Sequence, residues 1–327
     1  MNAEFDARCV ALLTRLGICA PDAVTEILPL AGGVASDIAA VTFADRTVCV
    51  KFALSKLKVA ADWFVPVRRG RAEYAWLKVA GETVPAAVPQ LYGWSDAENG
   101  FAMEYVAGPD VYLWKAALLQ GVAPNGQAQL VADALGRVHA ASTRTGFDTS
   151  PFDNADDFDA IRLEPYLRFT AGLHPALADR LGALADATKA SRTALVHGDV
   201  SPKNILFRDG RPIILDAECA TMGDPAFCVN HLVLKSFHLP ALRDSLRAEV
   251  LSFWAAYARH VVWEPAPDVE ARIAALLPAL MLARVDGKSP VEYLAEPQRA
   301  AVRAAAIPLI STPPSTLSAL LSRLPQG

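Results

Sequence analysis

Residues 197–204 of the chain read HGDVSPKN, and residues 213–218 read IILDAE. Together they give the order H-x-D, four residues, N, and later a second aspartate. The β-rich residues between the two stretches contain the dipeptide Asp209-Gly210, which is a strong signal for a hairpin turn. Because a hairpin brings its two ends together, we expect the two aspartates and the asparagine to lie close to one another.

Three side chains of this pattern supply what phosphoryl transfer requires. That reaction needs a carboxylate that orients the attacking hydroxyl and accepts its proton, together with amide and carboxylate oxygens that hold Mg²⁺ on the phosphates. Asp199 on a loop, Asn204 where the loop enters a strand, and Asp216 just past the next strand provide all three groups. The alternative is a surface loop with ordinary polar residues, which the simultaneous match of several positions disfavours.

The chain divides into a β-rich first part and a helical second part. The first part predicts a short entry helix over 4–19, then a five-stranded antiparallel sheet and one further helix, with strands over 25–30, 36–43, 46–52, 90–94 and 100–105 and the helix over 71–79. The second part predicts long helices over 127–141, 175–190, 245–260 and 270–285, and the hairpin over 204–207 and 212–216. We therefore expect two domains, residues 1–106 and 107–327.

The composition is that of a folded protein without a polyanion-binding surface. Hydrophobic residues make up 53% of the 327 residues, charged residues make up 20%, and the formal net charge is −4, so disorder is excluded and binding to nucleic acid or anionic lipid is disfavoured. The apolar stretch 304–321 is interrupted by three prolines, and we expect no membrane span. Five cysteines without a close CxxC pair, and a start that lacks a signal-peptide pattern, favour a cytoplasmic location.

With these motifs the chain resembles the aminoglycoside phosphotransferase and choline kinase family over about residues 25–290. Members of that family share the fold of protein kinases but phosphorylate small molecules. The resemblance implies an α+β, bilobal protein-kinase-like fold, with a small antiparallel-sheet N-terminal lobe and a larger, mainly helical C-terminal lobe. It also implies transfer of the γ-phosphoryl group of ATP, with Mg²⁺, to a hydroxyl of a small molecule such as an aminoglycoside, amino alcohol, sugar or nucleoside.

By motif position, the resemblance gives each residue of the catalytic stretch a role. Asp199 is implied to be the catalytic base, and Asn204 and Asp216 the Mg²⁺ ligands. Glu218 is implied to be a carboxylate beside the metal or a ligand of a second metal. His197 is implied to be structural.

Two residues of the first domain are candidates to hold the phosphates of ATP. Lys51 lies on a strand that is otherwise apolar on both faces, so its charge needs a partner, and an ATP phosphate is the candidate. Glu73 is the helical acid best placed to pair with Lys51. Taken alone, a lysine in such a run is more often an edge residue, and a helical glutamate can equally be solvated.

Two backbone segments complete the expected nucleotide site. The loop that contains Gly32, Gly33 and Ser36 offers N–H groups to phosphate oxygens, although a Gly-Gly turn alone is a weak signal. The backbone groups of Glu104 and Val106 stand where the family's inter-lobe hinge binds adenine, with a plain linker as the alternative.

The chain departs from the family's pattern at two positions. Ser201 stands where members often carry His, and we count it among the candidate substrate contacts. Cys228 stands where the family's G-D-P-x-x-D stretch ends in an Asp that braces the catalytic loop, and a thiol is a weak donor and acceptor. The alternative function is therefore a catalytically degenerate nucleotide-binding protein. A protein kinase is disfavoured because Gly198 stands where those enzymes carry Arg.

The sequence gives two opposite indications of the charge of the substrate. An acidic cluster over residues 148–159 suits a cationic amine, although such clusters are usually solvated loops. Arg284, Asp286 and Lys288 at the end of a helix suit an anionic group or ribose hydroxyls, although cations at a helix end also stabilise the helix dipole. We leave the charge of the substrate open at this point.

Overall fold

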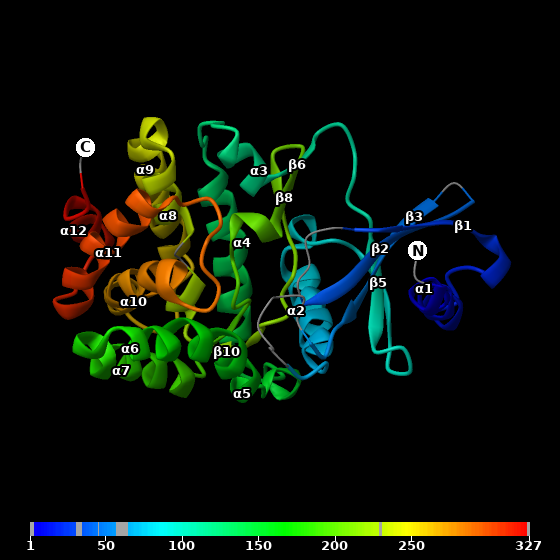
Figure 1. Ribbon diagram of the computed structural model, residues 1–327. Coiled ribbons are helices and arrows are strands. Elements are labelled where there is room, and N and C mark those ends of the chain that lie inside the picture. Colours follow the sequence, from blue (N-terminus) through cyan, green and yellow to red (C-terminus); the bar gives the residue numbers. More distant parts are fainter. Residues whose placement is uncertain (1–2, 31–34, 45, 57–64, 229–230, 326–327) are drawn as a thin grey trace.

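The protein has two lobes, one built on a small sheet and one mainly helical (Figure 1). The computed structural model describes residues 3–30, 35–44, 46–56, 65–228 and 231–325. Gly32 and Gly33, predicted to face the phosphates, lie outside the described residues, as does the side chain of Cys228.

The N-terminal lobe is an antiparallel sheet of five strands in the order β1-β2-β3-β5-β4. The strands are β1 (Val24–Pro29), β2 (Ser36–Phe43), β3 (Arg46–Ala53), β4 (Leu91–Ser95) and β5 (Gly100–Glu104). The first three form the expected meander, but β5 and not β4 pairs with β3. This places the end of β5, where the chain leaves the sheet, beside the central strand.

The alternation of side chains along β3 decides where its lysine points. One face of the sheet packs against α1 (Ala3–Arg15), where Val50 meets Leu12. The other face carries Cys49, in the same core as Trp76 of α2 (Arg69–Thr83). Because successive side chains of a strand point to opposite faces, Lys51 lies on the α2 face, which is turned toward the C-terminal lobe.

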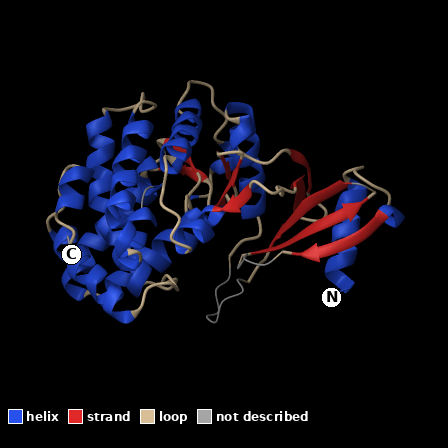
Figure 2. Ribbon diagram, turned by 90° about the horizontal axis from the view of Figure 1, so that it is seen from above, coloured by secondary structure: helices blue, strands red, loops and turns tan. Residues whose placement is uncertain are grey.

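Most of the C-terminal lobe is helical (Figure 2). Its helices are α3 (Trp114–Leu119), α4 (Gln127–Ser142), α5 (Ala155–Phe158), α6 (Phe169–Leu173), α7 (Ala178–Ala190), α8 (His231–His238), α9 (Arg243–Ala258), α10 (Ala266–Asp286), α11 (Glu296–Ser311) and α12 (Leu317–Ser322). Between α5 and α6 the chain continues as a wider π-helical segment, Asp159–Arg168. Among the helices of the described residues, none combines the length and apolar character needed to cross a membrane.

Two small sheets hold residues 197–204 and 213–218 in place. β6 (Val111–Leu113), β8 (Ile205–Arg208) and β9 (Arg211–Ile214) form one sheet, and β7 (Ala194–Val196) pairs with β10 (Thr221–Gly223) in the other. The predicted hairpin is present as β8 and β9, and both turn residues have positive φ, 50° at Asp209 and 71° at Gly210. The loop from β7 to β8 and the loop from β9 to β10 therefore run beside each other.

Candidate active site

His197 fixes the start of the loop between β7 and β8, as expected of a structural residue. Its ring is fully buried, and burial lowers the pKa of His197 to about 4, so the ring is neutral near pH 7. Its Nε2 lies 3.0 Å from the carbonyl oxygen of Leu215 and therefore donates to it, while Nδ1 accepts from the amide of Asp199 at 3.2 Å. One neutral ring thus ties the two loops together.

Gly198 allows the loop to turn directly against the second loop. Its φ is +76°, and a Cβ at this position would lie 2.6 Å from the carbonyl oxygen of Cys219. Any larger residue here would therefore clash with the backbone as well as adopt an unfavourable φ. The Arg that protein kinases carry at this position has no room in this chain.

The carboxylate of Asp199 is buried and surrounded by donors. Its Oδ2 accepts from Nδ2 of Asn204 at 3.1 Å, and it lies 2.8 Å from Nη2 of Arg162 and 3.0 Å from Nζ of Lys203. Arg162 also donates from Nε to the carbonyl oxygen of Gly198 at 3.0 Å. These contacts hold the loop and the carboxylate in one orientation.

Two of these donors, Lys203 and Arg162, were not predicted from the sequence. Lys203 directly precedes Asn204, and its spacing of four from Asp199 was a signal available in the motif itself. Arg162 comes from the π-helical segment, far upstream in the chain, where no local pattern marks it. Its side chain has little solvent exposure, so its charge is matched within the protein by Asp199.

Asn204 and Asp216 meet at the open end of the hairpin. Asn204 donates from Nδ2 to the backbone oxygen of Asp199 at 3.0 Å, which leaves its amide oxygen available as a ligand. Asp216 has a φ of +67°, and the amide of Leu215 beside it donates to the backbone oxygen of Asn204 at 2.9 Å. Burial opposes the charge of Asp216, but Lys51 and Lys203 outweigh it and hold the pKa of that carboxyl below its usual value.

Lys51 connects the sheet to this group of residues. It is 2% exposed, its Nζ lies 2.7 Å from Oε1 of Glu73, and it forms a second ion pair with Asp216. Burial alone would lower the pKa of Lys51, but the carboxylates of Asp216 and Glu73 raise it above its ordinary value. The pairing of Lys51 with Glu73 that the sequence suggests is therefore present, and it joins α2 of the N-terminal lobe to the catalytic stretch.

The donor set fits Mg²⁺. Amide and carboxylate oxygens are hard ligands, and Mg²⁺ is usually held by one or two carboxylates together with waters and phosphate oxygens. Asn204 and Asp216 supply such a pair of groups, and Asp216 keeps 31% of its side chain exposed. Within the described part of the chain, no group of three or more His, Cys, Asp or Glu residues forms a closed metal cage. An open site that relies on phosphate oxygens is consistent with both observations.

Comparison with known proteins identifies the family of the chain. The model of the phosphotransferase enzyme family matches residues 26–260. The chain belongs to the phosphotransferase enzyme family. Among curated proteins, none has a sequence that matches this chain significantly.

Solved structures confirm the predicted fold of this chain. A choline/ethanolamine kinase family protein from Mesorhizobium loti is 17% identical with a TM-score of 0.54, and the match covers 99% of both chains. A putative aminoglycoside phosphotransferase from Ralstonia eutropha is 15% identical with a TM-score of 0.54, over 98% of this chain and 99% of that one. An ethanolamine kinase from Plasmodium vivax is 12% identical with a TM-score of 0.55, over 99% of this chain and 86% of that one.

The remaining predicted nucleotide contacts lie near the place where the two lobes meet. Ser36 is buried at the start of β2. The amide of Glu104 donates to the oxygen of Gln90 at 2.7 Å, and its carboxylate pairs with Arg208 of β8. The amide of Val106 takes part in no backbone hydrogen bond of the described residues, which leaves it available to a ligand.

Glu218 and Ser201 have protein partners in the structure. Oε2 of Glu218 lies 3.1 Å from Nε of Arg69, so this carboxylate ties the loop between β9 and β10 to α2. Ser201 is buried, and its backbone oxygen accepts from the amide of Asn204 at 2.8 Å. Their parts in metal and substrate binding remain predictions.

The stretch that ends in Cys228 is braced by another residue. Asp224 of that stretch lies 3.0 Å from Nε of Arg272 in α10, and its Oδ1 accepts from the amide of Ala226 at 3.0 Å. Arg272 is in turn held by Glu264 at 2.7 Å. The segment that follows β10 is thus anchored to α10.

The three predicted substrate residues at the end of α10 differ in their surroundings. Arg284 donates to the hydroxyl of Tyr166 at 3.0 Å. Asp286 lies 2.8 Å from both His174 and Arg303, and although burial raises the pKa of Asp286, its hydrogen bonds with Arg303 and His174 hold that pKa below its usual value. Lys288 pairs with Glu164 at 2.8 Å. Arg284 is thus the member of the set that reaches toward Tyr166, on the segment that holds Arg162.

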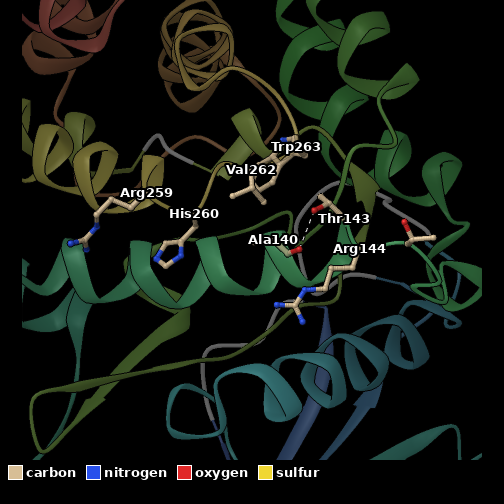
Figure 3. Close-up of a pocket in the computed structure, with 8 residues that line it drawn as sticks. Ala140, Thr143, Arg144, Arg259, His260, Val262 and Trp263 are labelled. Atoms are coloured by element: carbon tan, nitrogen blue, oxygen red, sulfur yellow. Dashed lines mark hydrogen bonds between the residues drawn. The ribbon is translucent and has the colours of Figure 1, made fainter.

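A pocket of about 490 Å³ lies elsewhere, at the end of α4 (Figure 3). Its lining includes Arg144, Arg259 and His260, and it contains none of the predicted site residues. α4 and α9 both end at this pocket, and the negative end of a helix dipole attracts cations. The arginines there are explained by the helix ends, without a ligand.

Proposed function

We propose that this phosphotransferase transfers the γ-phosphoryl group of ATP, with Mg²⁺, to a hydroxyl of a small molecule. The observation that carries the proposal is one connected group of side chains from both lobes. Lys51 and Glu73 come from the N-terminal lobe, and Asp199, Asn204 and Asp216 come from the two loops of the C-terminal lobe. Family membership over residues 26–260 supports the same class of reaction.

We propose that the first lobe and the edge of the second hold the nucleotide. Lys51 would bind phosphate oxygens, with Glu73 holding its ammonium in place. The backbone of Glu104 and Val106 would bind the adenine, and the loop that begins β2, with Ser36, would cover the phosphates. Mg²⁺, held by Asn204 and Asp216, neutralises charge on the phosphates when bound.

We propose that Asp199 acts on the acceptor. Its fixed carboxylate orients the acceptor hydroxyl and takes its proton as the oxygen–phosphorus bond forms and the bond to ADP breaks. Glu218 lies next to the metal and is held there by Arg69. Ser201 fixes the loop around the base through its backbone oxygen. We also assign Arg284 to the acceptor site, with Asp286 and Lys288 positioning the end of its helix.

The test is acceptor-dependent release of ADP from Mg-ATP. Pools of amino alcohols, sugars, nucleosides and aminoglycosides cover the substrate classes that the family suggests, and EDTA is the control for the metal. We expect at least one pool to stimulate ADP release, and EDTA to abolish the stimulation. Tight Mg-ATP binding with no stimulation by any pool would instead support a degenerate nucleotide-binding protein.

We further propose that the phosphotransferase works in the cytoplasm as a protein with reduced thiols. Cys9, Cys19, Cys49 and Cys219 are all free in the structure. Burial raises the pKa of Cys9 and Cys49 to about 12, so these thiols are unreactive near neutral pH.

A further inference from the structure

The acidic cluster over residues 148–159 is largely neutralised by protein cations. Nη2 of Arg68 lies 2.6 Å from Oδ1 of Asp157. Nζ of Lys189 lies 2.9 Å from carboxylate oxygens of both Asp156 and Asp159. The cluster therefore does not present a set of unpaired carboxylates, and the main indication of a cationic substrate is lost.

The C-terminal lobe contains a group of three cationic side chains that has fewer carboxylate partners than cations. Lys235 of α8 is 2% exposed, and Arg284 of α10 has a buried Nε without an acceptor. In the described part of the chain, neither of the two forms an ion pair with a carboxylate. Lys115 of α3 lies near them, and its charge is matched by Glu292 in the loop after α10. Three cations thus face one carboxylate.

The surroundings of Lys235 explain how an unmatched ammonium is tolerated. Its Nζ lies 3.8 Å from the centre of the Tyr293 ring, a contact in which the ring face offsets part of the charge. Burial, aided by the nearby charges of Lys115 and Arg284 and opposed by Glu292, still lowers the pKa of Lys235 to about 8. A buried cation that lacks a carboxylate gains from any anion that can reach it.

This cationic group is connected to the catalytic base. The ring centre of Tyr166 lies 5.8 Å from the guanidinium carbon of Arg162 and 5.5 Å from that of Arg284. Arg162 in turn pairs with Asp199. All of these residues come from the C-terminal lobe, whereas Lys51 on the nucleotide side comes from the sheet (Figure 1). The cations therefore belong to the same lobe as Asp199, and not to the lobe that carries Lys51.

We propose that the acceptor alcohol carries an anionic group, a carboxylate or a phosphate, which Lys235 and Arg284 bind. The proposal rests on the proposed phosphotransfer function, because it names the acceptor of that reaction. It resolves the opposite indications in the sequence, since the acids at 148–159 are largely paired and the two cations are not matched by carboxylates. The anion supplies the charge that the site lacks.

The test measures binding of alcohols that differ in the charge of one substituent. Isothermal titration calorimetry on the full chain with Mg-ADP compares glycerate, glycerol and 2-amino-1,3-propanediol, and likewise glucuronate, glucose and glucosamine. Glycerol 3-phosphate and glucose 6-phosphate separate a phosphate from a carboxylate. We expect the anionic member of at least one series to bind at least tenfold more tightly than its neutral and amine counterparts.

Variants of Lys235 connect this preference to the site. Lys235→Met should weaken binding of the anionic member at least tenfold, and Lys235→Arg should retain most of it. Lys78→Met removes a lysine exposed on α2 and should change nothing. Thermal unfolding checks the fold: because Lys235→Met removes an unmatched buried cation, its midpoint should equal or exceed that of the parent.

Two results would overturn the inference. One is a panel in which no anionic member binds more tightly than its neutral and amine counterparts. The other is a folded Lys235→Met variant that binds the anionic member as the parent does. Since binding is measured without transfer, a chain that binds anionic alcohols and phosphorylates none would overturn the proposed function alone. A panel in which only the amine-bearing alcohols bind and are phosphorylated on their hydroxyl is a case of the first result, and it would leave the proposed function standing.

Discussion

At the scale of single residues, the proposed base Asp199 is held by groups that the sequence motif only partly contains. Asn204 and Lys203 lie within the motif, and their contacts with Asp199 follow from the short loop between β7 and β8. Arg162 reaches the same oxygen from the π-helical segment, whose local pattern says nothing about the partner it will meet in three dimensions. Contacts between residues that are close in the sequence could be predicted. The contact of Arg162 could not, because it depends on tertiary packing.

Gly198 provides a prediction at this scale. Gly198 and Gly210 have similar φ values of +76° and +71°, but an added Cβ meets the Cys219 carbonyl oxygen at 2.6 Å in the first case and nothing within 4 Å in the second. We expect Gly210→Ala to cost about 1–2 kcal/mol, for the left-handed backbone alone. Gly198→Ala should cost about 2 kcal/mol more, because the two loops must separate, and it should lose most of the activity.

Urea unfolding of the two glycine variants checks the expectation. Gly210→Ala is the matched control, since it has the same change of side chain in the same backbone region. Equal losses of unfolding free energy in the two variants would mean that the loop relaxes freely, contrary to the close contact with Cys219.

At the scale of elements, the spacing of apolar residues and the residues typical of turns predicted most of the helices and strands. β2 begins and ends at Ser36 and Phe43, as its apolar pattern indicates, and the Asp-Gly turn correctly marks the hairpin of β8 and β9. The strands β6, β7 and β10 are three residues each, too short for a period to be recognised. The order of β4 and β5 depends on pairing between distant residues, which no local pattern records.

The buried ion pair between β3 and α2 gives a prediction about stability. Lys51→Met would leave the carboxylate of Glu73, 2% exposed, without its cation, and should cost about 3–5 kcal/mol of unfolding free energy. The double variant Lys51→Met/Glu73→Leu should be more stable than Lys51→Met, because it buries no unpaired charge. Lys78→Met, on the exposed face of α2, should stay within about 0.5 kcal/mol of the parent.

Denaturant midpoints of the parent and the three variants decide this point. A double variant that is no more stable than Lys51→Met would show that the burial of the Glu73 carboxylate does not depend on Lys51.

At the scale of the whole molecule, ion pairs hold the two lobes together around the site. Arg69 of α2 pairs with Glu218, Arg68 pairs with Asp157, and Arg208 of β8 pairs with Glu104 at the end of β5. The sequence indicated two parts with different periods, but these pairs join residues far apart in the chain and were outside its reach. They explain why residues from both parts form one site.

Two buried histidines predict how stability depends on pH. Burial lowers the pKa of His139 to about 3 and that of His197 to about 4, from an ordinary value of 6.5. Below pH 6.5 the unfolded chain therefore binds protons that the folded chain does not. Their contribution to stability is complete above pH 6.5 and is lost as the pH falls toward 4, by at most about 2.7 kcal/mol per pH unit for the two together.

Urea unfolding at pH 7 and pH 5 tests this account with the variant His139→Phe. The variant should lose less stability than the parent between the two pH values, because one of the two groups no longer takes up a proton on unfolding. If the parent and the variant lose the same amount, the neutral buried state of His139 is wrong.

The rate of acceptor-dependent ADP release by Asp199→Asn tests whether Asp199 is the base. The control is Asp209→Asn, which makes the same change in the hairpin turn at a positive φ of 50° that Asn tolerates. We expect Asp199→Asn to lose at least about 10³-fold in kcat, with Mg-ATP affinity unchanged within about threefold, while Asp209→Asn matches the parent. An Asp199→Asn variant that turns over within tenfold of the parent would contradict the assignment of the base.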